Sequence, residues 1–349
     1  FDTLDYRPAR GRVNARLRQA PHPKEGTMKY VHLGRSNLVV SEFCLGTMMF
    51  GGQTDEAESL RIMDYAYEHG VNFIDTANAY NGGESEKIIG KWLGGRRDGV
   101  ILATKVRIPV GEGLNRGGLN RRSILSAVEA SLKRLNTDYI DIYYMHAPDY
   151  ETSLEESLDT MSGLVRSGKI RYYGVSNYAA WQIADMLAIC DKRNYIAPVI
   201  TQNVCNLLTR GIESELVPFL KAHEMGLAVY NPIAGGLLSG KHRPGEPAEN
   251  TRFYGNPGYY DRYWSDENFA AVEKLTRIAS ERGLSLLGLA LKWCAAQTHI
   301  TSVITGVSRL SQAEQNLASV EGDPLDAGAF EKCDEVWYSL AGKRFSYFR

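Results

Sequence analysis

Residues 72–80 read Asn72-Phe73-Ile74-Asp75-Thr76-Ala77-Asn78-Ala79-Tyr80, and the interpretation of the chain begins with them. The apolar residues among them follow the turn residue Gly70 and predict a short buried strand, which ends in the carboxylate of Asp75. A buried carboxylate without a partner costs several kcal/mol, or its pKa shifts until the group is neutral. Taken alone, Asp75 could cap a turn and Tyr80 could pack on a loop. If Asp75 is buried, another part of the chain must supply its partner.

The composition indicates a protein that acts on small molecules. Among 349 residues, Lys and Arg number 40 and Asp and Glu number 41, so the formal net charge is -1. This balance gives no net basic field for nucleic acid and no polybasic attraction to a membrane. No apolar stretch approaches the ~18 residues that a membrane span requires. We therefore expect a small-molecule partner, no nucleic acid and no membrane, and we leave open whether the chain forms an oligomer.

The cysteines indicate the cellular compartment. They are odd in number, widely spaced and mostly set in apolar runs: Cys44, Cys190, Cys205, Cys294 and Cys333. This pattern argues against a disulfide framework or a CxxC metal site and favours reduced thiols. We predict a cytoplasmic location and no metal site.

The first 27 residues differ from the rest of the chain. They carry several arginines and few large apolar residues, so they lack the apolar centre of a secretory signal. They could be a transit-like or vector-derived arm, or an extension upstream of a start at Met28. We expect residues 1–27 to form an arm with few core contacts, and residues 28–349 to form a single domain.

From Met28 onward, strand-like and helix-like segments alternate. Residues 29–40 read as a β-hairpin, and seven strands then begin near Phe43, Asn72, Val100, Tyr139, Ile170, Val199 and Leu227. Thr301–Thr305 adds an eighth strand, after a long helical region at 266–297. Because each helix must return the chain to the same end of the sheet, the strands are parallel. Eight such units favour a closed (β/α)8 TIM barrel, with the N-terminal hairpin closing its bottom.

Local signals mark the ends of these helices. We expect capping boxes at two helix starts and left-handed glycine caps at three helix ends: Ser153 with Glu156, Ser311 with Glu314, and Gly70, Gly168 and Gly226. The first strand is not followed by GxGxxG, so the doubly wound dinucleotide-binding fold loses its main support.

Polar residues follow three neighbouring strands at their carboxyl ends, where barrels place their chemistry. They are Asp75 with Tyr80, Lys105 and His146. A tyrosine can give its proton to a carbonyl oxygen as hydride reaches the carbon, and a nearby lysine should lower its pKa for this task. Asp75 would keep Lys105 charged and in place. His146 would orient the carbonyl or share the proton relay.

With these residues in place, the sequence resembles the aldo-keto reductase superfamily from about Met28 to at least Asn316. The resemblance rests on Asp75 in Phe73-Ile74-Asp75-Thr76-Ala77, Tyr80 before Asn81-Gly82-Gly83, Lys105 in Ala103-Thr104-Lys105, and His146 in Met145-His146-Ala147-Pro148. It implies an NADPH-dependent reduction of an aldehyde or ketone to the alcohol, reversible, with these four residues as the catalytic set and Tyr80 as the general acid.

The resemblance also implies a cofactor site. Ser176, Asn177 and Gln202 would hold the nicotinamide amide, and Tyr230 would stack on the ring. The rest of the implied cofactor-binding set is Gly46, Thr47, Met48, Asn231, Pro232, Ile233, Ala234, Gly236, Leu238, Gly240, Lys241, Gly306, Ser308, Arg309, Gln312, Gln315 and Asn316. Ser308, Arg309 and the following helix N-terminus suit a 2′-phosphate, which favours NADPH over NADH.

The substrate and two other classes of protein stay open. Substrate contacts should come from residues 48–50, 107–120, 147–150 and 243–264, whose aromatic side chains suit a sugar ring, an apolar pocket or ordinary loop packing. One alternative is a cofactor-binding regulatory subunit, because the sequence also resembles potassium channel beta subunits. The other is a barrel hydrolase or isomerase that uses a metal or two carboxylates, although no cluster with ligand spacing is found at the other strand ends.

Overall fold

A computed structural model describes residues 28–249 and 251–341. Eight parallel strands close into a barrel, because the last strand pairs with both the first and the seventh. The strands are β3 (Phe43–Gly46), β4 (Phe73–Asp75), β5 (Ile101–Val106), β6 (Ile140–Met145), β7 (Ile170–Ser176), β8 (Ile200–Val204), β9 (Gly226–Tyr230) and β10 (Ser302–Gly306). The predicted (β/α)8 barrel is confirmed.

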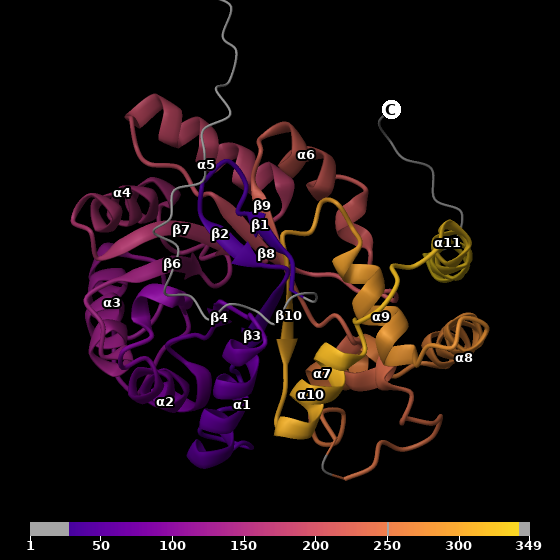
Figure 1. Ribbon diagram of the computed structural model, residues 1–349. Coiled ribbons are helices and arrows are strands. Elements are labelled where there is room, and N and C mark those ends of the chain that lie inside the picture. The colour runs from indigo at the N-terminus through magenta and orange to yellow at the C-terminus, as the bar shows by residue number, and fades with distance from the viewer. Residues whose placement is uncertain (1–27, 250, 342–349) are drawn as a thin grey trace, which may run out of the picture.

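Helices surround the strand ring, as Figure 1 shows. They are α1 (Glu56–Glu68), α2 (Glu84–Trp92), α3 (Arg121–Leu135), α4 (Leu154–Arg166), α5 (Ala180–Arg193), α6 (Leu216–Ala222), α7 (Pro257–Tyr263), α8 (Asp266–Ser280), α9 (Leu286–Ala295), α10 (Leu310–Ala318) and α11 (Ala327–Ala341). Short 3₁₀ segments lie at Tyr80–Gly83, Arg97–Gly99, Gly211–Glu213 and Ala234–Ser239. The residues 1–27, to which we assigned an arm, lie outside the described residues.

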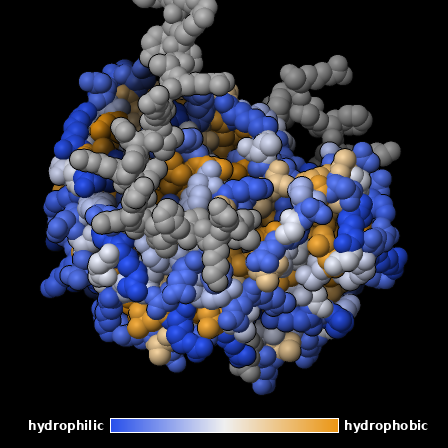
Figure 2. All heavy atoms as spheres, viewed as in Figure 1, coloured by the Kyte–Doolittle hydropathy of each residue, from blue (hydrophilic) through white to orange (hydrophobic). Residues whose placement is uncertain are grey.

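Alternation along the strands divides the apolar residues between two cores. On β5, Ala103 points into the barrel and packs with Phe73 and Ile142, while Leu102 belongs to the larger core beneath the helices. The same alternation turns Lys105 inward. The visible outer surface is mainly hydrophilic, with separate hydrophobic groups between the hydrophilic regions (Figure 2).

The N-terminal hairpin consists of β1 (Tyr30–His32) and β2 (Val39–Ser41), which pair antiparallel. Leu33 and Val40 are fully buried and pack with residues of the barrel interior, so the hairpin closes the barrel as predicted. Gly34 lies against the start of β9: a Cβ at this position would lie 2.5 Å from Gly226 N and 2.7 Å from Glu224 O. With φ of +55° as well, only glycine fits here without strain.

Two expectations about helix ends were wrong in part. Gly70 and Gly168 have φ of +87° and +76° as expected, but Gly226 is the first residue of β9, and Glu224 takes the left-handed conformation at φ of +51°. The region 266–297 is two helices, because the chain turns at Gly283, with φ of +65°, between α8 and α9.

Neither capping box forms. Ser153 does precede α4, but its side chain makes no capping hydrogen bond, and Glu156 accepts instead from Arg121 N at 2.8 Å. Helix α10 begins at Leu310, so Ser311 lies inside its first turn rather than before it. At α4 a backbone donor distant in sequence takes the glutamate of the box, and at α10 the carboxylate of Glu58 takes the backbone N–H of Leu310.

We expect Gly34→Ala to lower the free energy of unfolding by about 1 to 3 kcal/mol, because the methyl group meets β9 backbone and the left-handed φ disfavours alanine. Urea unfolding followed by circular dichroism measures the change. Gly94→Ala is the control, since a Cβ at Gly94 meets nothing within 4 Å and its φ is ordinary. An equal, small effect of both substitutions would contradict the close packing of the hairpin.

Candidate active site

A cavity of about 490 Å³ opens at the carboxyl ends of the barrel strands. Asp75, Tyr80 and His146 line it, and Lys105 lies directly behind them, fully buried. These four predicted residues come from the ends of β4, β5 and β6 and from the 3₁₀ segment after β4. The structure therefore brings the whole predicted catalytic set to one place.

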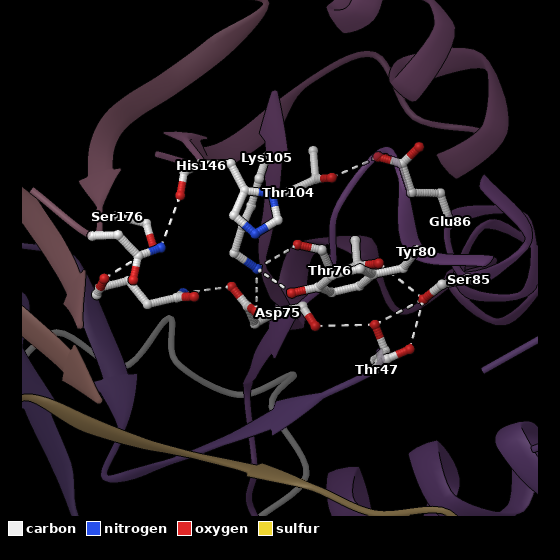
Figure 3. A network of polar contacts seen from close by, with 12 residues as sticks. Thr47, Asp75, Thr76, Tyr80, Ser85, Glu86, Thr104, Lys105, His146 and Ser176 are labelled. Carbon is white, nitrogen blue, oxygen red and sulfur yellow. Dashed lines mark hydrogen bonds and ion pairs between the residues drawn. The ribbon is translucent and has the colours of Figure 1, made fainter. Parts of the chain in front are cut away.

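Lys105 is the centre of the polar network in Figure 3. Its Nζ donates to Asp75 Oδ1 at 2.5 Å, to Thr76 O at 2.8 Å and to Tyr80 Oη at 3.3 Å. Burial alone would lower the pKa of Lys105, but the charge of Asp75 and the contact with Tyr80 raise it overall. Lys105 is thus a charged ammonium whose three protons all have acceptors.

The pKa of Tyr80 shifts against our expectation. Burial raises it above its ordinary value, and this effect outweighs the lowering by Lys105; the charge of Asp75 raises the pKa further. The expectation of a lowered pKa was wrong because it counted the nearby cation and left out the loss of water. Tyr80 therefore keeps its proton at neutral pH and holds it next to a charged donor.

His146 is neutral. Burial, with Lys105 and Arg107 nearby, lowers its pKa to about 3. The ring lies edge-on to Tyr80, with ring centroids 6.0 Å apart. Its Nδ1 is buried and has no hydrogen-bond partner among the described residues. A neutral imidazole beside the tyrosine can orient a polar oxygen without adding charge to the site.

The residues that the sequence assigned to the nicotinamide lie side by side and bind one another. Asn177 donates to His146 O at 3.0 Å and accepts from the Tyr230 hydroxyl at 2.7 Å. Ser176 Oγ donates to Gln202 O at 2.9 Å, and Gln202 Nε2 donates to Asp75 Oδ2 at 2.8 Å. The side chains of this wall of the cavity therefore hold one another in place, and Gln202 connects them to Asp75.

A second wall has the features of an anion site. The 3₁₀ segment Ala234–Ser239 contains Gly235 and Gly236, with φ of +70° and +114°, and both line the cavity. Asn231 Nδ2 and Ser239 Oγ are buried without hydrogen-bond partners among the described residues. Lys241 lines the cavity beside them. Unpaired donors, glycine backbone and a lysine in one wall are what a phosphate group requires.

Most of the other residues assigned to the cofactor also line the cavity: Gly46, Thr47, Met48, Pro232, Ile233, Gly306, Ser308, Gln312, Gln315 and Asn316. Four do not. Ala234 and Leu238 are fully buried in the core, Gly240 is a turn residue with φ of +81°, and Arg309 is exposed next to the cavity-lining Ser308. The cofactor-binding roles of all these residues remain predictions.

Sequence reasoning missed several residues of the cavity wall: Gln53, Gly235, Ser239, His242, Leu287, Leu291, Ile304, Thr305 and Val307. Gly235 and Ser239 lie between residues of 233–241 that we assigned to the cofactor from the sequence, so their position in that run could have indicated them. The segments expected to meet the substrate reach the cavity at Met48, Met49, Ile108, Thr251, Arg252 and Tyr259. Phe50 is instead fully buried, and Tyr150 is largely exposed.

The described residues 28–249 and 251–341 hold no cluster of three or more His, Cys, Asp or Glu side chains arranged for a metal ion. In the same ranges, every helix is too short or too polar to cross a membrane.

Comparison with known proteins agrees with this fold. Residues 42–338 match the aldo/keto reductase family, and the chain belongs to that family of oxidoreductases. Members of the family act on small carbonyl compounds and generally use nicotinamide cofactors.

Three relatives are similar over most of their length. A probable voltage-gated potassium channel subunit beta of Arabidopsis thaliana is 36% identical, covering 92% of this chain and 100% of the relative. Aflatoxin B1 aldehyde reductase member 2 of Rattus norvegicus is 36% identical, covering 87% of each. The uncharacterized oxidoreductase YrpG of Bacillus subtilis is 37% identical, covering 84% of this chain and 91% of the relative.

The pKa of His146 predicts a loss of stability in acid. Between pH 6.5 and 3 the unfolded chain binds a proton that the folded chain does not, so stability falls as the pH decreases through this range. We expect wild type to lose about 2 kcal/mol more than His146→Gln between pH 7 and 4.5, measured by urea unfolding. His32→Gln, at an exposed position on β1, should follow wild type. Parallel curves for wild type and His146→Gln would show that His146 is protonated when folded.

Proposed function

We propose that the protein reduces an aldehyde or ketone to the alcohol, reversibly, by hydride transfer from NADPH with Tyr80 as the general acid. The observation that carries this proposal is the Tyr80 hydroxyl at the cavity, 3.3 Å from a fully buried, charged Lys105. A protonated tyrosine beside a fixed cation is suited to give up its proton as negative charge develops on an oxygen.

The cavity fits a dinucleotide phosphate. The unpaired donors Asn231 Nδ2 and Ser239 Oγ, the glycine backbone at 235–236 and Lys241 would hold its phosphates. Ser176, Asn177, Gln202 and Tyr230 would hold its nicotinamide end, on the wall nearest Asp75. Bound NADPH supplies the hydride.

The proton step follows from the contacts of Tyr80. Its hydroxyl donates to the carbonyl oxygen as that oxygen gains charge, and Lys105 stabilises the tyrosinate that remains. Asp75 balances the charge of Lys105 and holds its Nζ in line. The neutral ring of His146 orients the carbonyl. In the reverse direction the tyrosinate accepts the proton of the alcohol.

The preference for NADPH over NADH rests on fewer groups than the sequence suggested. Ser308 and the exposed Arg309 precede α10 and remain suited to a 2′-phosphate. However, Leu310 N at the start of α10 donates to Glu58 Oε1 at 2.6 Å, so a carboxylate already occupies part of that helix N-terminus. We therefore assign the 2′-phosphate to the side chains of Ser308 and Arg309 rather than to the helix.

A second candidate is a cofactor-binding regulatory subunit, favoured by the likeness to the Arabidopsis protein over its whole length. The name of the rat relative favours an aldehyde as substrate. A regulatory subunit would bind NADPH and turn it over slowly.

Three further points remain predictions: a cytoplasmic location, the possible oligomer and a single domain spanning residues 28–349.

We expect Tyr80→Phe to lower the rate of NADPH oxidation with an aldehyde panel by at least about 100-fold, because the general acid is lost. The affinity for NADPH, measured by quenching of protein fluorescence, should stay within twofold of wild type, which corresponds to about 0.4 kcal/mol in binding free energy. An unchanged rate in Tyr80→Phe would contradict proton donation by Tyr80. Tight NADPH binding by wild type without turnover of any carbonyl would favour the regulatory subunit.

We expect Arg309→Ala to weaken NADPH binding by about tenfold and to leave NADH binding unchanged, because only NADPH carries the 2′-phosphate. Titration of each cofactor against protein fluorescence measures both constants. Arg277→Ala, on the exposed side of α8, is the matched control for removing one surface cation. An equal loss for both cofactors would place Arg309 elsewhere than at the 2′-phosphate.

A further inference from the structure

A second buried ion pair lies just outside the cavity. Glu86 is fully buried, and the guanidinium of Arg134 lies 2.7 Å from its Oε2. The other carboxylate oxygen, Oε1, accepts from Thr104 Oγ1 at 2.5 Å. Neither Glu86 nor Arg134 lines the cavity. Burying a charged carboxylate is costly unless ion pairs and hydrogen bonds offset the loss of water. Glu86 has both kinds of partner, and this arrangement requires an explanation.

Glu86 and its partner Thr104 lie next to the two segments that carry the proposed acid and its lysine. Glu86 is in the first turn of α2, directly after the segment Tyr80–Gly83. Thr104 is the residue before Lys105 on β5, and it points out of the barrel where Lys105 points in. In Figure 3, dashed lines join Glu86 to Thr104 and Tyr80 to Lys105. The carboxylate of Glu86 therefore connects the segment that carries Tyr80 with the strand that carries Lys105.

Arg134 limits the shape of the tyrosine segment. A Cβ at Gly83 would lie 2.9 Å from both Cδ and Nε of Arg134, so the arginine side chain packs directly on the last residue of that segment. Apart from Glu86, its only other hydrogen bond in the described residues is a long one to Ser131 Oγ, 3.4 Å. Without the carboxylate of Glu86, the guanidinium would lose its anchor and Gly83 would lose its support.

We propose that Glu86 and Arg134 are a positioning pair that fixes the Tyr80 hydroxyl against Lys105 Nζ. The pair acts through Tyr80 and touches neither substrate nor cofactor. This inference rests on the proposed function, in which Tyr80 is the general acid.

Glu86→Ala tests the proposal by single-turnover NADPH oxidation with a saturating aldehyde. We expect a loss of about 100-fold, as for a catalytic group displaced by about 1 Å. Thr104→Val removes one hydrogen bond and keeps the ion pair, and it should lose about tenfold. NADPH affinity should stay within about twofold in both variants, since the pair is off the cavity wall.

A double-mutant cycle separates positioning from a general loss of structure. If the pair acts only through Tyr80, Glu86→Ala should change the residual rate of Tyr80→Phe by less than about twofold. The same factor in both backgrounds would overturn the proposal. Should Glu86→Ala fail to fold, Thr104→Val in the two backgrounds decides the question by the same criterion. A wild-type rate in Tyr80→Phe would instead overturn the proposed function, and this inference with it.

The matched control is the ion pair at the opposite end of β5. Asp141 lies 2.7 Å from Arg97, and its Oδ2 accepts from Leu102 N at 2.9 Å. The arginine side chains of both pairs are 16% exposed. Asp141→Asn should lower the melting temperature as Glu86→Ala does and leave the single-turnover rate unchanged. A matching loss of rate in Asp141→Asn would show that any damage to β5 slows the reaction, and would overturn the proposal.

Discussion

The structure depends on the ion pair of Lys105 and Asp75, which lies inside the barrel and is shielded from water. Removing two ions from water is costly, and their attraction offsets this cost only where geometry is good and every remaining donor has an acceptor. Lys105 meets that requirement with Asp75, Thr76 and Tyr80. Asp75 and Lys105 meet because β4 and β5 are neighbouring parallel strands whose carboxyl ends lie on one side of the barrel, so the barrel positions its polar centre.

The parts of the fold that follow from short-range patterns were predictable. Apolar runs that end in a polar residue marked the strands, and their regular spacing indicated crossover helices and hence a closed barrel. The capping boxes failed for a physical reason: groups at the starts of these helices bind residues that are distant in sequence. Arg121 takes Glu156, and Glu58 reaches α10 from another helix. Such competition depends on the tertiary structure.

The candidate site also has features that the sequence predicts and features that depend on the folded structure. The strand ends identified Asp75, Lys105 and His146, because their position in the barrel follows from the strand pattern. The sign of the pKa shift at Tyr80 did not follow, since it depends on how much water the folded chain removes. His242, Leu287 and Leu291 were missed because they come from a loop and a helix that approach the cavity only in the folded chain.

The order of the strands has a consequence for how such a protein can diversify. The residues proposed for proton transfer come from β4, β5 and β6, whereas most of those proposed for the cofactor follow β7 to β10. The barrel is thus split into two adjoining arcs, joined where Gln202 meets Asp75. Segments outside the strands, such as the one after β9 that brings Arg252 and Tyr259 to the cavity, can change without altering the strands of either arc. Substrate range can therefore drift by loop exchange while the reaction itself is inherited intact.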